Sequence, residues 1–316
     1  MTQTYSLALE VRAVQRVADD VLELTLCAAD RSPLPTWRPG AHVELLLPSG
    51  LARQYSLCGD PADTSSYTIA VLHEVNGRGG SAEVHEIAAV GIQFSANPPK
   101  NNFPLEAAES YLFIGGGIGI TPLLPMIVAV EQETRQWSLV YGGRTATSMA
   151  YVERLSNAGD RVDVWVESER GYPDFATILG AAPAGTLVYA CGPSGMLDAI
   201  RTEFGHHPHL AGLHVERFTA SGAIDVSGGS FEVELRRSGE IFTVAEGQPI
   251  LAEVKTRVPS HPFSCEEGYC GECETRVIDG IPDHRDDYLT EDEQQSGDVM
   301  MICVSRCKGR RLVLDL

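Results

Sequence analysis

The sequence has 316 residues, of which 43% are hydrophobic and 21% charged, and its formal net charge is −19. A chain of this length and composition is too long for one ordinary domain and too apolar to be disordered. The acidic balance without a basic stripe excludes a nucleic-acid-binding surface. The eight Cys are too few and too unevenly placed for a secreted disulfide scaffold.

Neither a secretion signal nor a membrane span is predicted. Charged residues recur at short intervals from Glu10 to Asp20, where a signal peptide would have an apolar run. Residues 110–130 carry no charge, but four glycines, Pro122 and Pro125 interrupt them. We therefore expect a soluble cytoplasmic protein in a reducing compartment.

Residues 1–104 have the pattern of short antiparallel strands. Apolar and polar residues alternate in 21–26, a strand in 42–50 ends in a turn, and 67–74 has strand composition. A helical pattern appears only at about 81–90. Strands at this spacing predict a small antiparallel β-barrel.

Residues 105–222 alternate between strand and helix patterns. Strands are predicted at 111–114, 137–141, 162–167, 186–190 and 213–218. Helices are predicted from the glycines after the first strand to about 134, near 148–157 and near 194–204. This alternation predicts βαβ units and a parallel sheet.

The segment 219–230 is small, polar and Gly-rich, as a linker should be, and a third domain is predicted at 231–316. Its expected elements are a hairpin turning at Ser238–Gly239, a helix near 249–256, and strands at 300–304 and 311–316. Thr290 and Glu293 fit a capping box at the start of another helix.

Three thiols in nine residues mark this third domain. Cys265, Cys270 and Cys273 have the spacing C-x4-C-x2-C, and Cys303 follows after 29 intervening residues. Zinc ribbons normally use two C-x2-C pairs, whereas this spacing is typical of four thiolates shared between two irons. A 2Fe–2S cluster is favoured over structural zinc and over a redox disulfide, and Cys307 is expected to be an ordinary free thiol. Residues 231–316 resemble a plant-type ferredoxin, which implies a β-grasp fold and these four Cys as cluster ligands.

Two motifs in the barrel have the residues that a flavin needs. Arg53, Tyr55 and Ser56, followed by Leu57, offer a cation for phosphate, an aromatic ring and a hydroxyl for the flavin N5. Further on, Gly79 and Gly80 precede Ser81, a candidate N-cap, and free N–H groups at such a helix start bind phosphate. Each motif alone also fits plain packing or a turn. Together, in this order, they resemble the flavin domain of the ferredoxin–NADP reductase superfamily.

The α/β domain has two candidate nucleotide-binding loops. The glycine-rich segment after the first strand lets a pyrophosphate approach the backbone, and it contains Gly115, Gly116, Gly117, Gly119 and Thr121. The second loop, Cys191-Gly192-Pro193, follows a later parallel strand, where α/β proteins bind ligands. A buried core thiol is the alternative interpretation of Cys191. The superfamily resemblance implies that Cys191 lies near the nicotinamide and that Phe218, at the end of the last strand, covers the flavin.

The order of the three domains resembles the phthalate dioxygenase reductase and vanillate demethylase reductase family over essentially the whole chain. The resemblance implies FMN rather than FAD, NADH as donor, and a terminal oxygenase, of the Rieske type, as the acceptor protein. Arg144 follows the second parallel strand, where an acidic residue would grip a ribose hydroxyl, so NADPH is not excluded.

Hydride transfer needs no protein nucleophile, so Ser56, Cys191 and Phe218 are expected to be positioning residues. A flavin-dependent diaphorase or flavin reductase without a dedicated oxygenase, and a non-enzymatic zinc protein, are the alternative functions.

Overall fold

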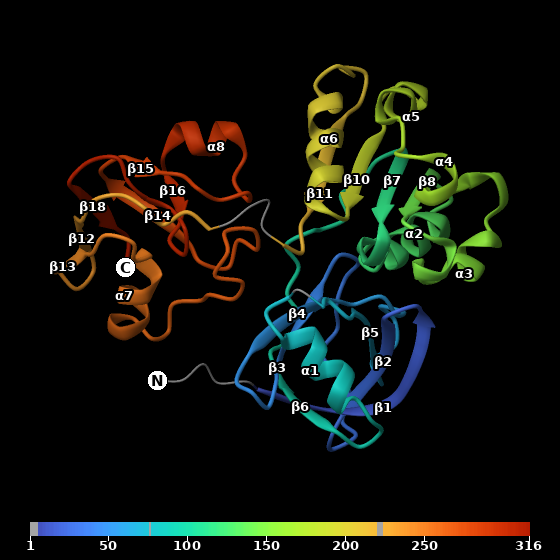
Figure 1. Cartoon of the computed structure of the whole chain (residues 1–316), viewed down its shortest axis with the longest axis horizontal. Helices are drawn as coiled ribbons and strands as arrows, with labels where there is room; N and C mark the ends of the chain where they lie inside the picture. The colour runs from blue at the N-terminus through green and yellow to red at the C-terminus, as the bar shows by residue number, and fades with distance from the viewer. Residues whose placement is uncertain (1–5, 76, 220–223) are drawn as a thin grey trace. The chain divides into compact units, whose positions relative to one another are not determined.

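The computed structural model of the chain describes residues 6–75, 77–219 and 224–316. The chain divides into two compact units, one spanning Tyr5–Arg217 and the other containing Phe218–Leu316. In Figure 1 the first unit is blue to yellow and the second is orange to red. The first unit contains both the predicted barrel and the predicted α/β domain, and the domain boundaries at 104 and 222 stay predictions.

The barrel is one antiparallel six-stranded sheet in the order β4-β3-β6-β1-β2-β5. Its strands are β1 (Leu7–Ala18), β2 (Val21–Ala28), β3 (His42–Leu46), β4 (Ala52–Ser56), β5 (Tyr67–Leu72) and β6 (Gln93–Ala96). A bridge between Leu57 and Ile69 joins the two edge strands, β4 and β5, and so closes the sheet. The predicted antiparallel barrel is confirmed.

The interior of the barrel is apolar because its strands alternate. In β2, Leu24 and Leu26 are fully buried in a core that also contains Leu9 and Val43, whereas Glu23 is only half-buried. Each fully buried leucine contributes about 1.5–3 kcal/mol relative to an exposed one. This core fixes the position of β4, the strand that carries the predicted flavin residues.

Helix α1 (Gly80–Ile87) lies between β5 and β6 in the chain, and residues 97–109 then lead to the second sheet. Tyr189 holds this connection. Its hydroxyl donates to the Pro104 carbonyl at 3.1 Å and accepts from the Glu106 N–H at 2.8 Å. The connection is therefore bound to the α/β part of the unit.

The second sheet has five parallel strands in the order β11-β10-β7-β8-β9. Its strands are β7 (Ser110–Gly116), β8 (Gln136–Gly143), β9 (Val162–Val166), β10 (Leu187–Cys191) and β11 (Gly212–Glu216). All residues of β7 and β10 are buried, as expected for central parallel strands. The strand order reverses between β7 and β10, and such a point is where open α/β sheets bind ligands.

Short helices accompany this sheet (green to yellow in Figure 1). They are the 3-10 helices η1 (Gly117–Ile120), η2 (Ala146–Ser148) and η3 (Gly159–Arg161), and the α-helices α2 (Leu123–Gln132), α3 (Val152–Ser156), α4 (Glu167–Arg170), α5 (Phe175–Ala181) and α6 (Ser194–Phe204). Leu179 of α5 and Leu197 and Ile200 of α6 are fully buried in a core with Leu112 and Val188 of the sheet.

The C-terminal unit contains a mixed five-stranded sheet in the order β13-β12-β18-β14-β16 and a small β15-β17 sheet. Its elements are β12 (Phe231–Leu235), β13 (Glu240–Val244), α7 (Ile250–Arg257), β14 (Glu274–Asp279), β15 (Pro282–Asp283), α8 (Glu291–Ser296), β16 (Val299–Met301), β17 (Arg306–Cys307) and β18 (Arg311–Leu314). β12 and β18 pair in parallel, and α7 packs Ile250, Leu251 and Val254 into the core. This is the predicted β-grasp arrangement.

Two arginines bind the C-terminal part of the predicted linker to this unit. Arg285 donates to the carbonyls of Asp225 and Ser227, both at 2.8 Å. Arg306, only 1% exposed, donates to the carbonyls of Gly228 at 3.3 Å and Gly229 at 3.0 Å. Residues 225–229 are therefore attached to the unit, whereas residues 220–223 of the linker lie outside the described residues.

Some element predictions need correction. Helix α3 is confined to Val152–Ser156 instead of 148–157, and α4 and α5 were not predicted. β11 ends at Glu216, so Phe218 lies beyond the strand instead of ending it. β16 ends at Met301, before Cys303. The capping box of Thr290 and Glu293 is present at the start of α8.

Within the described ranges, no helix is long and apolar enough to cross a bilayer.

Candidate functional site

The predicted flavin residues lie on and just after β4. Strand alternation and pairing with β3 place Arg53 and Tyr55 on one face and Ser56 on the other. The Tyr55 hydroxyl is buried and has no hydrogen-bond partner among the described residues, and burial raises the pKa of Tyr55. A buried hydroxyl without a partner fits a bound group that supplies one. The side chain of Leu57 is fully buried in the barrel core, and its N–H donates to the Ala41 carbonyl at 2.9 Å, so its predicted contact with a flavin stays a prediction.

The predicted phosphate site is built where Arg53 meets the start of α1. Arg53 donates to the Arg78 carbonyl at 3.1 Å, and a Cβ on Gly80 would lie 2.4 Å from the Arg53 Nε. Only glycine leaves room for this close approach of guanidinium and helix start. Cation and N–H groups together suit a flavin phosphate.

The predicted N-cap Ser81 is wrong. Gly79 occupies the N-cap position in a left-handed conformation, with φ of 85°, and Ser81 lies inside α1. The Ser81 hydroxyl instead accepts from the N–H of Glu74 at 3.0 Å, which ties α1 to the loop after β5. Glycine adopts positive φ without a steric cost, so it replaces the side-chain cap.

The two candidate nucleotide loops pack against each other at the carboxyl ends of β7 and β10. A Cβ on Gly119, which belongs to η1, would lie 2.2 Å from the Cys191 carbonyl oxygen. Gly116 is similarly close to Pro193, and Gly192 to the Gly116 backbone. Gly115 and Gly117 flank this contact, and Thr121 is 1% exposed with its hydroxyl bonded to the Ile118 carbonyl at 2.9 Å. Both loops therefore lie at the sheet edge where α/β proteins bind nucleotides, and their contact with a pyrophosphate stays a prediction.

Ser56, Cys191 and Glu216 meet where the barrel contacts this sheet edge. The Ser56 hydroxyl and the Cys191 thiol both hydrogen-bond to the Glu216 carboxyl, the thiol at 3.9 Å. Burial raises the pKa of Glu216 to about 8, although both hydrogen bonds oppose the shift. Burial and the neighbouring Glu216 raise the pKa of Cys191, so the thiol stays neutral at pH 7. Two predicted positioning residues are thus joined by a carboxyl group that was not among the predicted site residues.

The raised pKa of Glu216 predicts a pH dependence. A folded-state pKa of about 8 against an ordinary 4.5 means that the neutral carboxyl favours folding below about 4.5. This contribution declines as the pH rises and is lost above about 8. Glu216→Gln, which cannot ionise, should flatten the fall in melting temperature between pH 5 and 9. Parallel melting curves for wild type and variant would contradict the assignment.

Two further predicted site residues, Arg144 and Phe218, take no part in the hydrogen bonds of Glu216. Arg144 is exposed directly after β8, and its carbonyl accepts from the Ser168 N–H at 3.1 Å. Phe218 is half-buried and belongs to the C-terminal unit. The predicted function of Phe218 over a flavin stays a prediction.

The four predicted cluster ligands in the C-terminal unit are all buried, each at most 8% exposed. Thiol contacts link them in the order Cys270, Cys265, Cys303 and Cys273. The contacts with Cys270 and Cys303 lower the pKa of Cys265 most, and backbone N–H groups of the loop add to this. One of these, from Glu267, lies 3.3 Å from the Cys265 sulfur.

In the parts of the chain that the structure describes, no group of three or more His, Cys, Asp or Glu side chains is arranged to hold a single metal ion. A 2Fe–2S cluster instead shares four thiolates between two irons, and a row of four buried thiols with N–H donors fits that group.

The loop of the first three thiols depends on its glycines. Gly268 and Gly271 have φ of 80° and 79°. A Cβ on Gly268 would lie 2.6 Å from Val304 and 3.2 Å from the Asp286 backbone. Asp286 is buried and accepts hydrogen bonds from the Ser305 hydroxyl and the Leu289 N–H. These bonds fix the backbone segment against which Gly268 packs.

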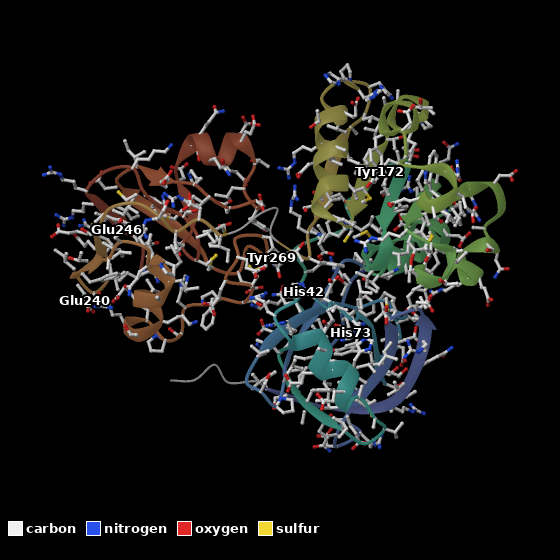
Figure 2. All side chains as sticks on the ribbon, viewed as in Figure 1. His42, His73, Tyr172, Glu240, Glu246 and Tyr269 are labelled. Carbon is white, nitrogen blue, oxygen red and sulfur yellow. The ribbon has the colours of Figure 1, made fainter. Side chains whose placement is uncertain are left out.

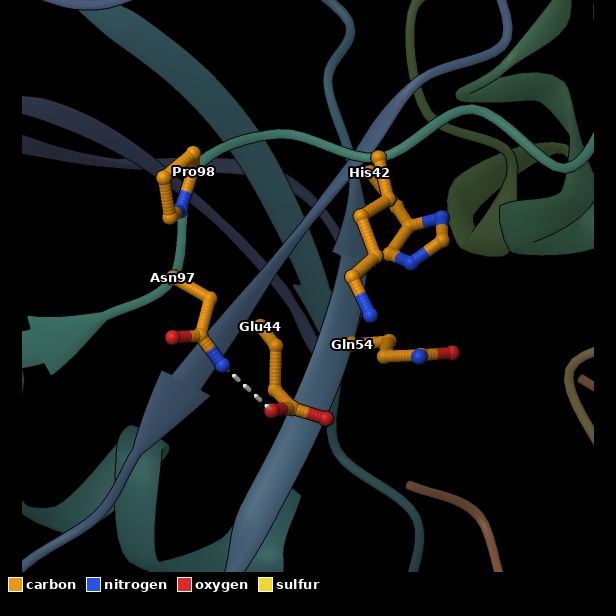
Figure 3. Close-up of a pocket in the computed structure, with 6 residues that line it drawn as sticks. His42, Glu44, Gln54, Asn97 and Pro98 are labelled. Carbon is orange, nitrogen blue, oxygen red and sulfur yellow. Dashed lines mark hydrogen bonds between the residues drawn. The ribbon is translucent and has the colours of Figure 1, made fainter. Parts of the chain in front are cut away.

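Figure 3 shows a small pocket on the barrel, lined by His42, Glu44, Gln54, Asn97, Pro98 and Lys100. The Asn97 side chain donates to Glu44 at 3.1 Å across it. None of the predicted flavin or nucleotide residues lines this pocket, so it is not assigned to either cofactor.

Comparisons with known proteins agree with this division of sites. A model of the 2Fe-2S iron-sulfur cluster binding domain matches residues 233–308, and a model of the oxidoreductase NAD-binding domain matches residues 113–202.

Two curated relatives match nearly the whole chain. Phenoxybenzoate dioxygenase subunit beta of Ectopseudomonas oleovorans is 42% identical over 313 residues, which cover 98% of this chain and 97% of that protein. Vanillate O-demethylase oxidoreductase of Pseudomonas sp. (strain HR199 / DSM 7063) is 38% identical over 97% of this chain and 98% of that protein.

Two solved structures are also similar over 98% of this chain. Phthalate dioxygenase reductase, described as a modular structure for electron transfer from pyridine nucleotides to 2Fe-2S, has a TM-score of 0.72 at 33% identity, with 98% of that chain covered. An intact type IV self-sufficient cytochrome P450 monooxygenase has a TM-score of 0.87 at 38% identity. This chain spans only 41% of that longer one.

Proposed function

Because this chain belongs to the family of oxygenase reductases that includes phthalate dioxygenase reductase and vanillate O-demethylase oxidoreductase, we propose that it is the reductase component of a multicomponent oxygenase. It takes electrons from NADH and passes them through a flavin and its own 2Fe–2S cluster to a terminal oxygenase. The observation that carries the proposal is the Glu216 carboxyl group, to which both Ser56 and Cys191 hydrogen-bond. It brings the flavin-binding strand to the nucleotide-binding edge, in a chain that also has four buried thiols.

When bound, the flavin accepts a hydride and releases its electrons singly, and the cluster takes up one electron at a time. The residues of this chain hold the flavin, the nucleotide and the cluster in place. Arg53 and the start of α1 would hold the flavin phosphate, and the buried Tyr55 hydroxyl, without a partner among the described residues, would bond to the flavin. Thr121 and the glycines around η1 shape the pyrophosphate site together with Gly192 and Pro193. Cys265, Cys270, Cys273 and Cys303 hold the cluster.

At the junction, Glu216 orients the Ser56 hydroxyl, and the neutral Cys191 thiol adds no charge beside the nicotinamide. Ser56 and Cys191 thus position the nicotinamide and flavin rings without exchanging protons with them. Their burial, 7% and 0% exposed, also keeps water from the place where hydride passes.

We further propose FMN as the flavin, NADH as the preferred nucleotide, the cytoplasm as the location and a Rieske-type oxygenase as the acceptor. The cytoplasm keeps thiols reduced, as the four cluster Cys require, and this supports a cytoplasmic location. Relatives named as reductases of a dioxygenase and a demethylase support a Rieske partner. The exposed Arg144, at the place of the ribose, keeps NADPH as an outcome to be tested.

The similarity to a P450 monooxygenase favours a second candidate acceptor, a cytochrome P450. Reconstitution decides between the two. A purified Rieske oxygenase that turns over with this reductase supports the proposal, and turnover with a P450 alone contradicts the Rieske assignment. Reduction of dyes or oxygen only, with no oxygenase accepted, would instead support a diaphorase.

The central experiment is an anaerobic titration of the purified protein with NADH and then NADPH, with identification of the released flavin. We expect bleaching of both flavin and cluster absorbance, iron and sulfide in equal amounts, and FMN as the released flavin. A colourless protein with stoichiometric zinc would overturn the proposal.

Ser56→Ala tests the junction. Loss of the hydroxyl should slow reduction of the flavin by NADH about tenfold, since a misplaced reacting group costs one to two orders of magnitude. The cluster spectrum should stay intact because the four thiols lie in the other unit. Stopped-flow bleaching at the wild-type rate would remove Ser56 from the site.

A further inference from the structure

Tyr151, at the start of α3, has a backbone conformation that ordinary packing does not explain. Its φ is 65°, in the left-handed region. For a residue with a Cβ this conformation is unfavourable, and it persists only where the surroundings stabilise it. The contacts of the side chain identify what stabilises it here.

The Tyr151 hydroxyl reaches from the α/β part of the unit into the barrel. It donates to Oε2 of Glu23 in β2 at 2.8 Å and lies 3.7 Å from Sγ of Cys58. Cys58, 1% exposed, is itself held by Thr68, whose carbonyl accepts from the Cys58 N–H at 2.9 Å. One hydroxyl therefore contacts two separate segments of the barrel, β2 through Glu23 and the residues after β4 through Cys58.

These groups form a network that is stable at neutral pH. Burial raises the pKa of Tyr151 and raises that of Cys58 to about 12, so both are protonated and can donate. The Tyr151 hydroxyl therefore keeps its proton for the hydrogen bond to the Glu23 carboxyl oxygen.

The position of Cys58 relates this network to the hydride path. Cys58 follows Ser56 by two residues, and Ser56 contacts Glu216 at the nucleotide edge. The end of β4 thus meets the α/β part twice, once through Ser56 and once through Cys58. Nearby, the Asp19 N–H donates to the Thr147 carbonyl at 2.8 Å. One contact would leave the two sheets free to rotate, whereas several restrict that rotation.

We propose that Glu23, Cys58 and Tyr151, here called the Tyr151 latch, set the orientation of the nucleotide-binding sheet against the barrel, so that a bound nicotinamide faces the flavin strand. Tyr151 is then a positioning residue that acts through the end of β4 and touches neither ring. The inference rests on the proposed function, because the latch can affect hydride transfer only if the chain binds a flavin and NADH.

The test uses Tyr151→Phe in the holoprotein, which removes only the hydroxyl. Anaerobic stopped-flow reduction by NADH separates the limiting rate constant of flavin bleaching from the apparent Kd. We expect the limiting rate constant to fall about tenfold, the apparent Kd to change less than about twofold, and the long-wavelength charge-transfer absorbance to weaken. Amide hydrogen exchange in residues 53–58 should become faster even without nucleotide.

The matched control is Tyr172→Phe in the same unit, labelled in Figure 2. Tyr172 is 87% exposed, so loss of its hydroxyl should change neither rate nor exchange. Glu23→Gln keeps an acceptor for the Tyr151 hydroxyl and should restore most of the rate that Glu23→Leu loses. The Glu23 pair also provides the test if Tyr151→Phe does not fold.

Unchanged exchange and an unchanged limiting rate constant in both Tyr151→Phe and Glu23→Leu overturn the latch. A wild-type protein whose flavin neither nucleotide reduces contradicts the proposed function instead. Faster exchange with an unaltered rate also overturns the latch, because the network would then be structural only.

Discussion

Cys303→Ala is expected to abolish delivery of single electrons to an oxygenase while NADH-dependent reduction of ferricyanide continues. Cys303 is 3% exposed and contacts both Cys265 and Cys273, so it links two of the three loop thiols. A cluster held by three thiolates and an open position should be lost, because all four positions of such clusters are normally filled by Cys. The flavin and nucleotide residues lie in the other unit and should still accept hydride.

The measurements are iron and sulfide content, the visible spectrum, and the two activities side by side. Cys307→Ala is the matched control, since this half-buried Cys lies four residues away and its thiol bonds to the Arg311 carbonyl and the Gly309 N–H. The control should keep its iron. A Cys303→Ala protein with a full cluster, or one that loses stoichiometric zinc, would refute the assignment of the thiols.

The second large effect is expected from Gly119→Ala. The added Cβ would lie 2.2 Å from the carbonyl oxygen and 2.4 Å from the carbonyl carbon of Cys191, where only backbone can move aside. Overpacking of this kind costs about 1–3 kcal/mol, and 1.4 kcal/mol corresponds to a tenfold change in affinity. The kcat/KM for NADH should therefore fall about 10- to 100-fold.

Gly195→Ala is the control for this substitution. Gly195 lies in the first turn of α6 with open space around it, and alanine is the better helix former there. It should leave kcat/KM unchanged and not lower the melting temperature. If Gly119→Ala binds and oxidises NADH normally, the two loops do not form the nucleotide site.

The parts of the site that the sequence predicts well are those whose chemistry is local in the chain. Thiol spacing depends on a loop of nine residues, and the predicted flavin residues lie in two short motifs at 53–57 and 79–81. The alternation of apolar residues in 21–26 and the buried runs at 111–114 and 186–190 predict a barrel and a parallel sheet, and both are present.

The parts that sequence reasoning missed depend on contacts between distant segments. The link between Ser56 and Glu216 requires the barrel and the parallel sheet to be folded and docked. Glu216 ends β11 two residues before Phe218, and nothing in this stretch of sequence indicates Ser56 as its partner. The left-handed Tyr151 has no signature either, because bulky residues seldom adopt that conformation. Ser81 was assigned as a cap since serine favours that position, but the flexible Gly79 took its place.

The attachment of residues 225–229 by Arg285 and Arg306 shortens the chain segment that connects the cluster-bearing unit to the other unit. Only residues 218–224, seven by count, lie between Arg217 and this anchored stretch, and a fully extended segment of that length spans roughly 25 Å. A short tether gives the cluster an effective concentration on the order of millimolar around its flavin partner. The rate constant for reduction of the cluster by the flavin should therefore be first order and independent of protein concentration. Electron transfer from the cluster to the oxygenase, which requires two proteins to meet, should be second order.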